Sequence, residues 1–382
     1  MKKILFGLFL FLAATFGSQA QEKVKFLLFA DLHYDIMPDG EERLRTILRE
    51  AERQKADFIL QLGDFIPAEP RYSPVKQLIR MCSVPFYHTL GNHDVDKNDK
   101  QAYLDFWRMP ASYYYFDKGC FRFIVLDSGF FVDRDGETKS YDKGNYARVE
   151  EESRNRYGRE QLEWLRDALA DTSRICVLFS HAPVNDRYDR ISENNRGIHR
   201  IIAGARDHGT PVAIVFGGHM HSDNYHCIDG IHYMQVNSAS NIWGGAEFVN
   251  TERYPVEVYS RYPALKYVIP YDRPLYAVVE IDARGEIRIE GVRGKYVKPE
   301  ADPELLRAKP YPCSPVISTL RLKFFPFSAY SSSFVFPSSF FRYSPGVMSN
   351  CALKQRVKYR GEPKPKRSAM SAICREGSFR SR

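Results

Sequence analysis

Residues 25–33 read KFLLFADLH, an apolar run that ends in Asp31 and His33, two side chains that can bind a metal ion. The same arrangement, an apolar run followed directly by polar residues, recurs along the chain. The later apolar runs are followed by Gly63-Asp64, Gly91-Asn92-His93-Asp94, Ser180-His181 and Gly218-His219-Met220-His221. Short apolar runs of this kind predict buried strands. We therefore expect the polar motifs to gather at the carboxyl edge of an α/β sheet.

The segments between these runs support that fold class. Leu44, Ile47, Leu48 and Ala51 have the spacing of an amphipathic helix, and the residues between them are charged. We predict strands at 25–30, 58–62, 84–90, 175–179, 211–216, 232–236, 275–281 and 286–292. We predict helices near 44–51, 75–81, 161–169 and 196–207, and a β-hairpin at 113–126.

The motifs supply a set of metal-binding side chains. As possible ligands they offer two carboxylates, one amide and four imidazoles, with one further imidazole, His93, left for acid chemistry. A single histidine in an apolar neighbourhood is more often a packed core residue, and His88 and His232 fit that description. His219 and His221 differ, because two imidazoles spaced two residues apart lie on the same side of an extended chain. The ordered set predicts two divalent metal ions side by side.

The motif order DxH, GD, GNHD, H and GHxH resembles the signature of the calcineurin-like metallophosphoesterases, from Phe26 to Ser222. The resemblance implies a four-layer α/β/β/α sandwich, two divalent cations (Mn, Fe or Zn) and a bridging hydroxide as nucleophile. It further implies the metal ligands Asp31, His33 and His221 for the first cation, Asn92, His181 and His219 for the second, and Asp64 as the bridge.

The resemblance also implies how the motif around His93 acts. His93 would protonate the departing alkoxide, Asp94 would fix its tautomer, and Asn92 and His93 would contact the substrate. Relatives of the purple acid phosphatase type have a Tyr ligand three residues after the bridging Asp, where this chain has Pro67. The implied activity is hydrolysis of phosphate monoesters or diesters of small molecules. The alternative is a catalytically silent binding or sensor module, which the intact ligand set disfavours.

The N-terminus has the pattern of a secretory signal peptide. Lys2 and Lys3 precede an apolar run from Ile4 to Phe16, and small residues around Ala20 suit cleavage there. A membrane anchor is the alternative, but the run is short for a span of about 20 residues. We expect residues 1–20 to be removed, no membrane span afterwards, and a periplasmic or extracellular protein.

The positive charge of the chain is concentrated at its C-terminal end. The formal net charge is +8, but residues 319–382 contain thirteen Lys or Arg against two acids, so residues 1–318 carry −3. We therefore expect no nucleic-acid partner for the catalytic part. We expect one phosphoesterase domain over residues 21–318, followed by a basic Ser- and Phe-rich tail that is disordered or non-native.

Two further groups of residues leave alternatives open. Seven aromatic residues between Asn241 and Tyr271 could form a wall that stacks on a nucleoside or sugar, or could simply cover the sheet edge. The seven cysteines have no CxxC or regular spacing. Some could pair in an exported protein, but Cys82, Cys120 and Cys176 are more typical of small core residues.

Overall fold

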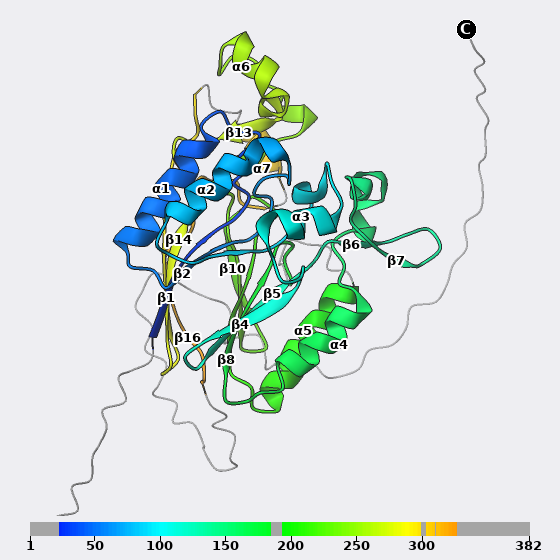
Figure 1. Ribbon diagram of the computed structural model, residues 1–382, viewed down its shortest axis with the longest axis vertical. Coiled ribbons are helices and arrows are strands. Elements are labelled where there is room, and N and C mark those ends of the chain that lie inside the picture. Colours follow the sequence, from blue (N-terminus) through cyan, green and yellow to red (C-terminus); the bar gives the residue numbers. More distant parts are fainter. Residues whose placement is uncertain (1–22, 185–192, 299–302, 310, 327–382) are drawn as a thin grey trace, which may run out of the picture. The chain divides into compact units, whose positions relative to one another are not determined.

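The computed structural model describes residues 23–184, 193–298, 303–309 and 311–326. Its first sheet has the strand order β16-β15-β14-β1-β2-β3 (Figure 1). β1, β2 and β3 are parallel, whereas β14, β15 and β16 continue the sheet in antiparallel pairs. The bounds are β1 Lys23–Phe29, β2 Phe58–Gln61, β3 Phe86–His88, β14 Ala277–Asp282, β15 Glu286–Gly291 and β16 Leu320–Lys323.

The second sheet has the order β10-β11-β9-β8-β5-β4. Its four inner strands are parallel, and an antiparallel strand closes each edge. The bounds are β4 Tyr114–Lys118, β5 Phe121–Leu126, β8 Ile175–Ser180, β9 Val212–Gly217, β10 Asn224–Ile228 and β11 Ile231–Gln235. Every residue of β5, β8, β9 and β11 is buried, as expected for strands covered on both faces.

The main core lies between the two sheets. Phe26 of β1 stacks on Phe58 of β2, with ring centroids 4.8 Å apart, and meets Phe123 and Phe179 of the second sheet edge to face. Neighbouring residues on the same strands point the other way, as the two-residue period of a strand requires. Each sheet therefore has a second apolar face to cover.

Helices cover those outer faces. Leu44 and Ile47 of α1 (Gly40–Arg53) pack in one cluster with Leu27 and Ile59 of the first sheet, and α2 (Ser73–Met81) contributes Val75 to it. α4 (Arg159–Ala168) and α5 (Glu193–Asp207) pack in the same way against the second sheet. The result is the expected α/β class with α/β/β/α layers (Figure 1).

Shorter elements decorate this sandwich. Among them, β6 pairs with β7 in the segment between β5 and α4, and β12 pairs with β13 in the segment between β11 and β14. The bounds are α3 Lys100–Trp107, β6 Phe130–Val132, β7 Thr138–Ser140, β12 Asn241–Trp243, α6 Val256–Arg261, β13 Val268–Pro270 and α7 Pro303–Ala308. Sequence periodicity did not predict any of these seven.

The domain boundary expected at Ser318 is too early. β16 pairs with β15 beyond it, Phe324 is 95% buried, and the Phe324 N–H donates to the Gly285 carbonyl. Residues 319–326 therefore belong to the folded unit, because they complete an edge of the first sheet. The rest of the predicted tail and the predicted signal peptide lie outside the described residues.

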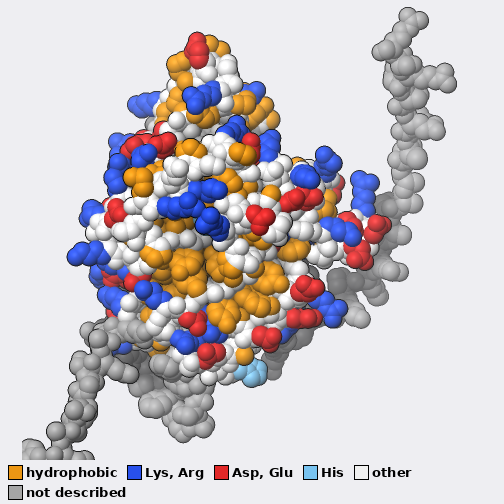
Figure 2. All heavy atoms as spheres, in the orientation of Figure 1, with side chains coloured by type: hydrophobic (Ala, Val, Ile, Leu, Met, Phe, Trp, Pro, Cys, Tyr) orange, Lys and Arg blue, Asp and Glu red, His pale blue; other side chains and the backbone are white. Residues whose placement is uncertain are grey.

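The surface of Figure 2 shows where the core comes close to solvent. Hydrophobic side chains gather around β4, where the half-buried rings of Tyr87 and Phe116 stack 3.8 Å apart at the edge of the main core.

Within the described ranges, no helix is long and apolar enough to cross a membrane. Cys176 is buried, and Cys82, Cys120, Cys227 and Cys313 are half-buried.

Candidate metal centre

The predicted ligands meet at the carboxyl ends of five parallel strands, contributed by both sheets. Asp31 and His33 follow β1, Asp64 follows β2, and His181 follows β8. Asn92 lies a few residues beyond β3, and His219 and His221 lie beyond β9. Because strands of both sheets end on the same side of the core, residues almost 190 positions apart in sequence come into contact.

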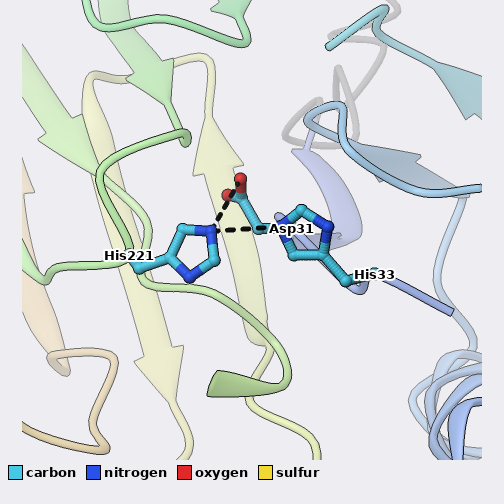
Figure 3. Close-up of side chains that lie close together, drawn as sticks. All are labelled: Asp31, His33 and His221. Carbon is cyan, nitrogen blue, oxygen red and sulfur yellow. Dashed lines mark hydrogen bonds and ion pairs between the residues drawn. The ribbon is translucent and has the colours of Figure 1, made fainter. Parts of the chain in front are cut away.

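Asp31, His33 and His221 form the first group of possible ligands (Figure 3). The Nε2 atoms of His33 and His221 are 3.2 Å apart, and Nε2 of His221 lies 3.4 Å from Oδ1 of Asp31. Nδ1 of His221 lies 2.8 Å from the carbonyl oxygen of Asn241, to which it can donate. That bond orients the ring so that its Nε2 lone pair faces the other two side chains, as in known metal sites.

The second group consists of Asp64, His181 and His219. Nε2 of His181 lies 3.2 Å from Oδ2 of Asp64, 3.2 Å from Nδ1 of His219 and 3.1 Å from Oδ1 of Asn92. The other nitrogen of His181, Nδ1, lies 2.8 Å from the Leu62 carbonyl, which fixes the tautomer that leaves Nε2 free for a metal. The four atoms therefore surround one small space.

These two groups fit divalent cations. Oδ1 of Asp31 is buried without a hydrogen-bond partner, an arrangement that is costly unless a cation satisfies it. Burial lowers the pKa of His33 to about 3, and burial together with His181 lowers that of His219 to about 4. Both imidazoles are thus neutral, which is the form that binds metal.

The carboxylates of the site already attract positive charge. Burial acts to lower the pKa of His181, but the Asp64 carboxylate outweighs it and raises that pKa to about 9. Burial acts to raise the pKa of Asp64, yet His181 and His93 hold it well below its usual range. Asp64 is therefore ionised, and a divalent cation would replace the proton of His181 as its counter-charge.

The backbone at the ligands is strained. Asp31, His33, Asp64, His219 and His221 all have φ between 46° and 71°, in the left-handed region that residues other than glycine rarely adopt. Such a conformation costs on the order of 1–3 kcal/mol per residue and persists only where the surrounding structure imposes it. Five of the seven predicted ligands share this conformation, as is typical of a functional site.

Two glycines permit the close approach of the motifs. Gly63 has φ of 96°, and a Cβ there would lie 2.5 Å from Nδ1 of His181. A Cβ on Gly91 would collide with the backbone nitrogen and the carboxylate of Asp64. Glycine at these two positions therefore lets the backbone lie close to the ligand side chains.

His93 lies beside the bridge candidate and has two other partners. Its backbone N–H donates to Oδ1 of Asp64 over 2.8 Å. Its ring Nδ1 lies 2.7 Å from Oδ2 of Asp96 and 3.1 Å from the Tyr146 hydroxyl, which itself donates to Oδ1 of Asp96. Burial acts to lower the pKa of His93, but Asp64 and Asp96 raise it to about 9.

The expected partnership between Asp94 and His93 is wrong. Both oxygens of Asp94 accept backbone N–H groups, from Phe65 and Ile66 on one side and from Asp64 and Gly91 on the other. Residues 93–95 form a single 3₁₀ turn, in which side chains three residues apart are aligned. Asp96, three residues after His93, therefore faces the imidazole, whereas Asp94 points into the protein and holds the loops.

Asp94 is an unusual carboxyl because of where it is buried. Burial and the neighbouring charge of Asp64 raise its pKa to about 7, although the backbone donors act in the opposite direction. A carboxyl in this position connects the loop after β2 to the loop after β3. It therefore sets the distance between Asp64 and Asn92 rather than acting on substrate.

Sequence reasoning missed three residues at the site. Asp96 could have been found from its spacing to His93, but Tyr146 and Asn155 belong to the irregular segment between β5 and α4 and have no motif. The side-chain amide of Asn155 lies 3.2 Å from Nε2 of His219, on the ring edge opposite the ligand group. Asn155 also has φ of 56° and bonds the Tyr141 hydroxyl through its backbone and side chain.

Comparisons with known proteins agree with this geometry. The model of the family described as calcineurin-like phosphoesterase matches residues 24–223, more than half of the chain. A protein of Oryza sativa subsp. japonica described as manganese-dependent ADP-ribose/CDP-alcohol diphosphatase is 23% identical over 294 residues, which covers 63% of this chain and 91% of that protein.

Two solved structures are similar at a greater distance. A dimetal phosphatase from Danio rerio is 15% identical with a TM-score of 0.49, covering 72% of this chain and 98% of that one. GAP50, the anchor in the inner membrane complex of Plasmodium, is 14% identical with a TM-score of 0.42, covering 73% and 86%. The family match and the two buried Asp and His groups together show that this chain is a metal-dependent phosphoesterase and belongs to the calcineurin-like phosphoesterase family.

Proposed function

We propose that this protein hydrolyses a phosphate ester, mono- or diester, of a small molecule at a centre of two divalent cations with Asp64 as the shared ligand. The observation that supports this most directly is that Asp64 belongs to one ligand group and also accepts a hydrogen bond from the backbone N–H of His93, the proposed proton donor. Manganese is the cation we propose first, since the rice relative is described as manganese-dependent.

The residues of this chain would divide the work. Asp31, His33 and His221 would hold one cation, and His181, His219 and Asn92 the other, with Asp64 between them. Bound there, the cations would lower the pKa of water and neutralise charge on the phosphoryl oxygens. Neutral imidazole and amide ligands suit that task, because additional carboxylates would cancel the positive charge that attracts phosphate.

His93 would give its proton to the departing oxygen. Asp96 and Tyr146 occupy its Nδ1, so Nε2 is the nitrogen available to a substrate. Burial and the charge of Asp96 raise the pKa of Tyr146, which keeps its hydroxyl protonated as a donor to Asp96. Asp96 and Tyr146 therefore hold the imidazole by Nδ1 and leave Nε2 for the proton transfer, which is the arrangement needed for general acid catalysis.

Two finer statements belong to the same proposal. Pro67 stands where a tyrosinate ligand would be expected, which supports a colourless centre rather than the purple acid phosphatase type. The N-terminal sequence supports an exported, periplasmic or extracellular enzyme, whose mature chain would begin after Ala20.

The test uses the full chain, depleted of metal by a chelator and reloaded with Mn, Zn or Fe. We expect about two cations per chain and metal-dependent hydrolysis of one or more chromogenic monoesters or diesters. His93→Ala should keep the metal content while losing most activity on esters with poor leaving groups. A protein that binds two cations and hydrolyses nothing on a broad panel would instead be a binding module.

A further inference from the structure

The aromatic residues between Asn241 and Tyr271 do not form one wall. Phe248 and Tyr271 are buried, 6% and 0% exposed, so they cannot stack on a ligand. Tyr254 and Tyr259 contact each other and pack, beside α6, on a separate apolar cluster that includes Leu265. These four of the seven rings are therefore buried or packed on neighbouring structure.

Trp243 is different because it reaches the metal centre. Its ring centroid lies 5.9 Å from that of His93 and 6.5 Å from that of His33, tilted by 36° and 38°. The side chain is 37% exposed, which is high for the largest apolar residue type. A tryptophan that touches the proton donor and a ligand, and still faces solvent, is placed to contact the substrate rather than the core.

The segment that carries Trp243 is rigidly attached to the ligands. The Ser238 and Ser240 hydroxyls donate to the carbonyls of Asp31 and Leu32, over 2.8 Å and 2.7 Å. The next residue, Asn241, provides the carbonyl that orients His221. Trp243 then pairs with Val268 in the small sheet of β12 and β13. The backbone that carries the indole is therefore held in place before any ligand arrives, which reduces the entropy lost on binding.

The turn after Trp243 fixes where the indole can lie. A Cβ on Gly244 would collide with the Phe248 side chain, so only glycine lets the chain fold back over that buried ring. Gly244 and Gly245 both donate their N–H groups to the Tyr267 carbonyl. The chain therefore reverses directly after Trp243 and leaves the indole at the end of the strand, at the edge of the site.

The position beside His93 determines which part of a substrate meets the indole. His93 is the proposed donor to the departing oxygen, so the group attached to that oxygen passes close to Trp243. We propose that Trp243 forms a stacking subsite for a flat aromatic ring carried by the departing alcohol, as in the nucleobase of a nucleoside 5′-phosphate. This inference rests on the proposed function and adds the substrate class to it.

Two substrates that differ only in the ring test this subsite. Adenosine 5′-monophosphate and ribose 5-phosphate lose phosphate from the same type of primary alkoxide, so leaving-group chemistry is matched and the base is the difference. Stacking of a base on an aromatic side chain is worth roughly tenfold to a hundredfold in affinity. We expect the wild-type manganese enzyme to prefer adenosine 5′-monophosphate in kcat/KM by about that factor.

Two variants of Trp243 separate the ring from simple bulk. Trp243→Leu keeps an apolar side chain and should lower kcat/KM for adenosine 5′-monophosphate about tenfold or more, while leaving ribose 5-phosphate within about twofold. Trp243→Tyr should retain part of the preference. Trp164→Leu is the matched control, since Trp164 lies on α4 against Tyr113 and Tyr115 and should not change the ratio.

Three results would overturn the inference. The first is an unchanged ratio in Trp243→Leu, and the second is an equal loss on both substrates, which would indicate a structural role. The third is a Trp243-dependent preference for phosphocholine over adenosine 5′-monophosphate and ribose 5-phosphate. That preference would indicate that the indole face binds a cation instead of a flat ring.

A binding measurement keeps this test separate from the proposed function. Adenosine 5′-monophosphate, but not ribose 5-phosphate, should quench the tryptophan fluorescence of the manganese-loaded protein, and the quenching should disappear in Trp243→Leu but remain in Trp164→Leu. If the protein hydrolyses no ester yet shows this quenching, the proposed function fails and the subsite stands. If it hydrolyses esters but shows neither quenching nor a ring preference, only the subsite fails.

Discussion

Asp94→Asn distinguishes a carboxylate that organises loops from one that assists the proton donor. Asp94 is fully buried, and each of its oxygens accepts two backbone N–H groups over 2.8–3.2 Å. An asparagine has one carbonyl oxygen, so it can serve only one of the two pairs. The remaining two N–H groups would face an amide NH₂, which is itself a donor.

The expected loss follows from those two orphaned donors. Leaving a buried N–H without an acceptor costs about 1–3 kcal/mol, so Asp94→Asn should lower the free energy of unfolding by about 2–6 kcal/mol. The free energy of unfolding of a whole domain is only about 5–15 kcal/mol, so the urea concentration at the unfolding midpoint should fall clearly. Because Asp94 links the loops of Asp64 and Asn92, manganese affinity should fall as well.

Urea unfolding of the metal-free protein, followed by tryptophan fluorescence, measures the first effect, and calorimetric titration with Mn measures the second. Asp96→Asn is the control, because Asp96 is about one third exposed and its carboxylate bonds side chains rather than the backbone. The free energy of unfolding of this variant should differ from the wild-type value by less than about 1 kcal/mol. If Asp94→Asn kept wild-type stability and metal affinity but lost turnover, Asp94 would be acting on His93 and the loop argument would be refuted.

The same contacts support three further predictions. Asp96→Asn should lower kcat/KM about a hundredfold on alkyl phosphates and much less on p-nitrophenyl phosphate, because a good leaving group needs no protonation. Equal losses on the two kinds of ester would contradict the role of Asp96 in positioning His93. Asn155→Ala should weaken one manganese site about 10- to 100-fold in a calorimetric titration, because the amide orients a ligand imidazole, and unchanged affinities would remove it from the site. A chain ending after Ser318 should unfold more easily than one ending after Pro326 by about 2–4 kcal/mol, since it lacks an edge strand and the buried Phe324 ring, and equal midpoints would return the boundary to Ser318.

Local patterns were sufficient for the α/β class and for the meeting of the motif residues at one edge of the sheets. A buried parallel strand must be apolar throughout, so the runs that end at Asp31, Asp64 and His181 are visible in the sequence without any tertiary information. The carboxyl ends of such strands lie at one edge, so the motif residues had to meet there. The elements β16 and α3 gave no such signal in the sequence.

The sequence by itself therefore predicted the strands and the motif side chains that gather at their carboxyl ends, since each motif follows closely on the strand that positions it. The tertiary structure decided which side chains surround them. Asp96 replaces Asp94 as partner of His93 because residues 93–95 form a 3₁₀ turn, whose geometry aligns positions three apart. Tyr146, Asn155 and Trp243 come from segments distant in the chain, and their contacts exist only because the packing of the sheets brings those segments to one edge.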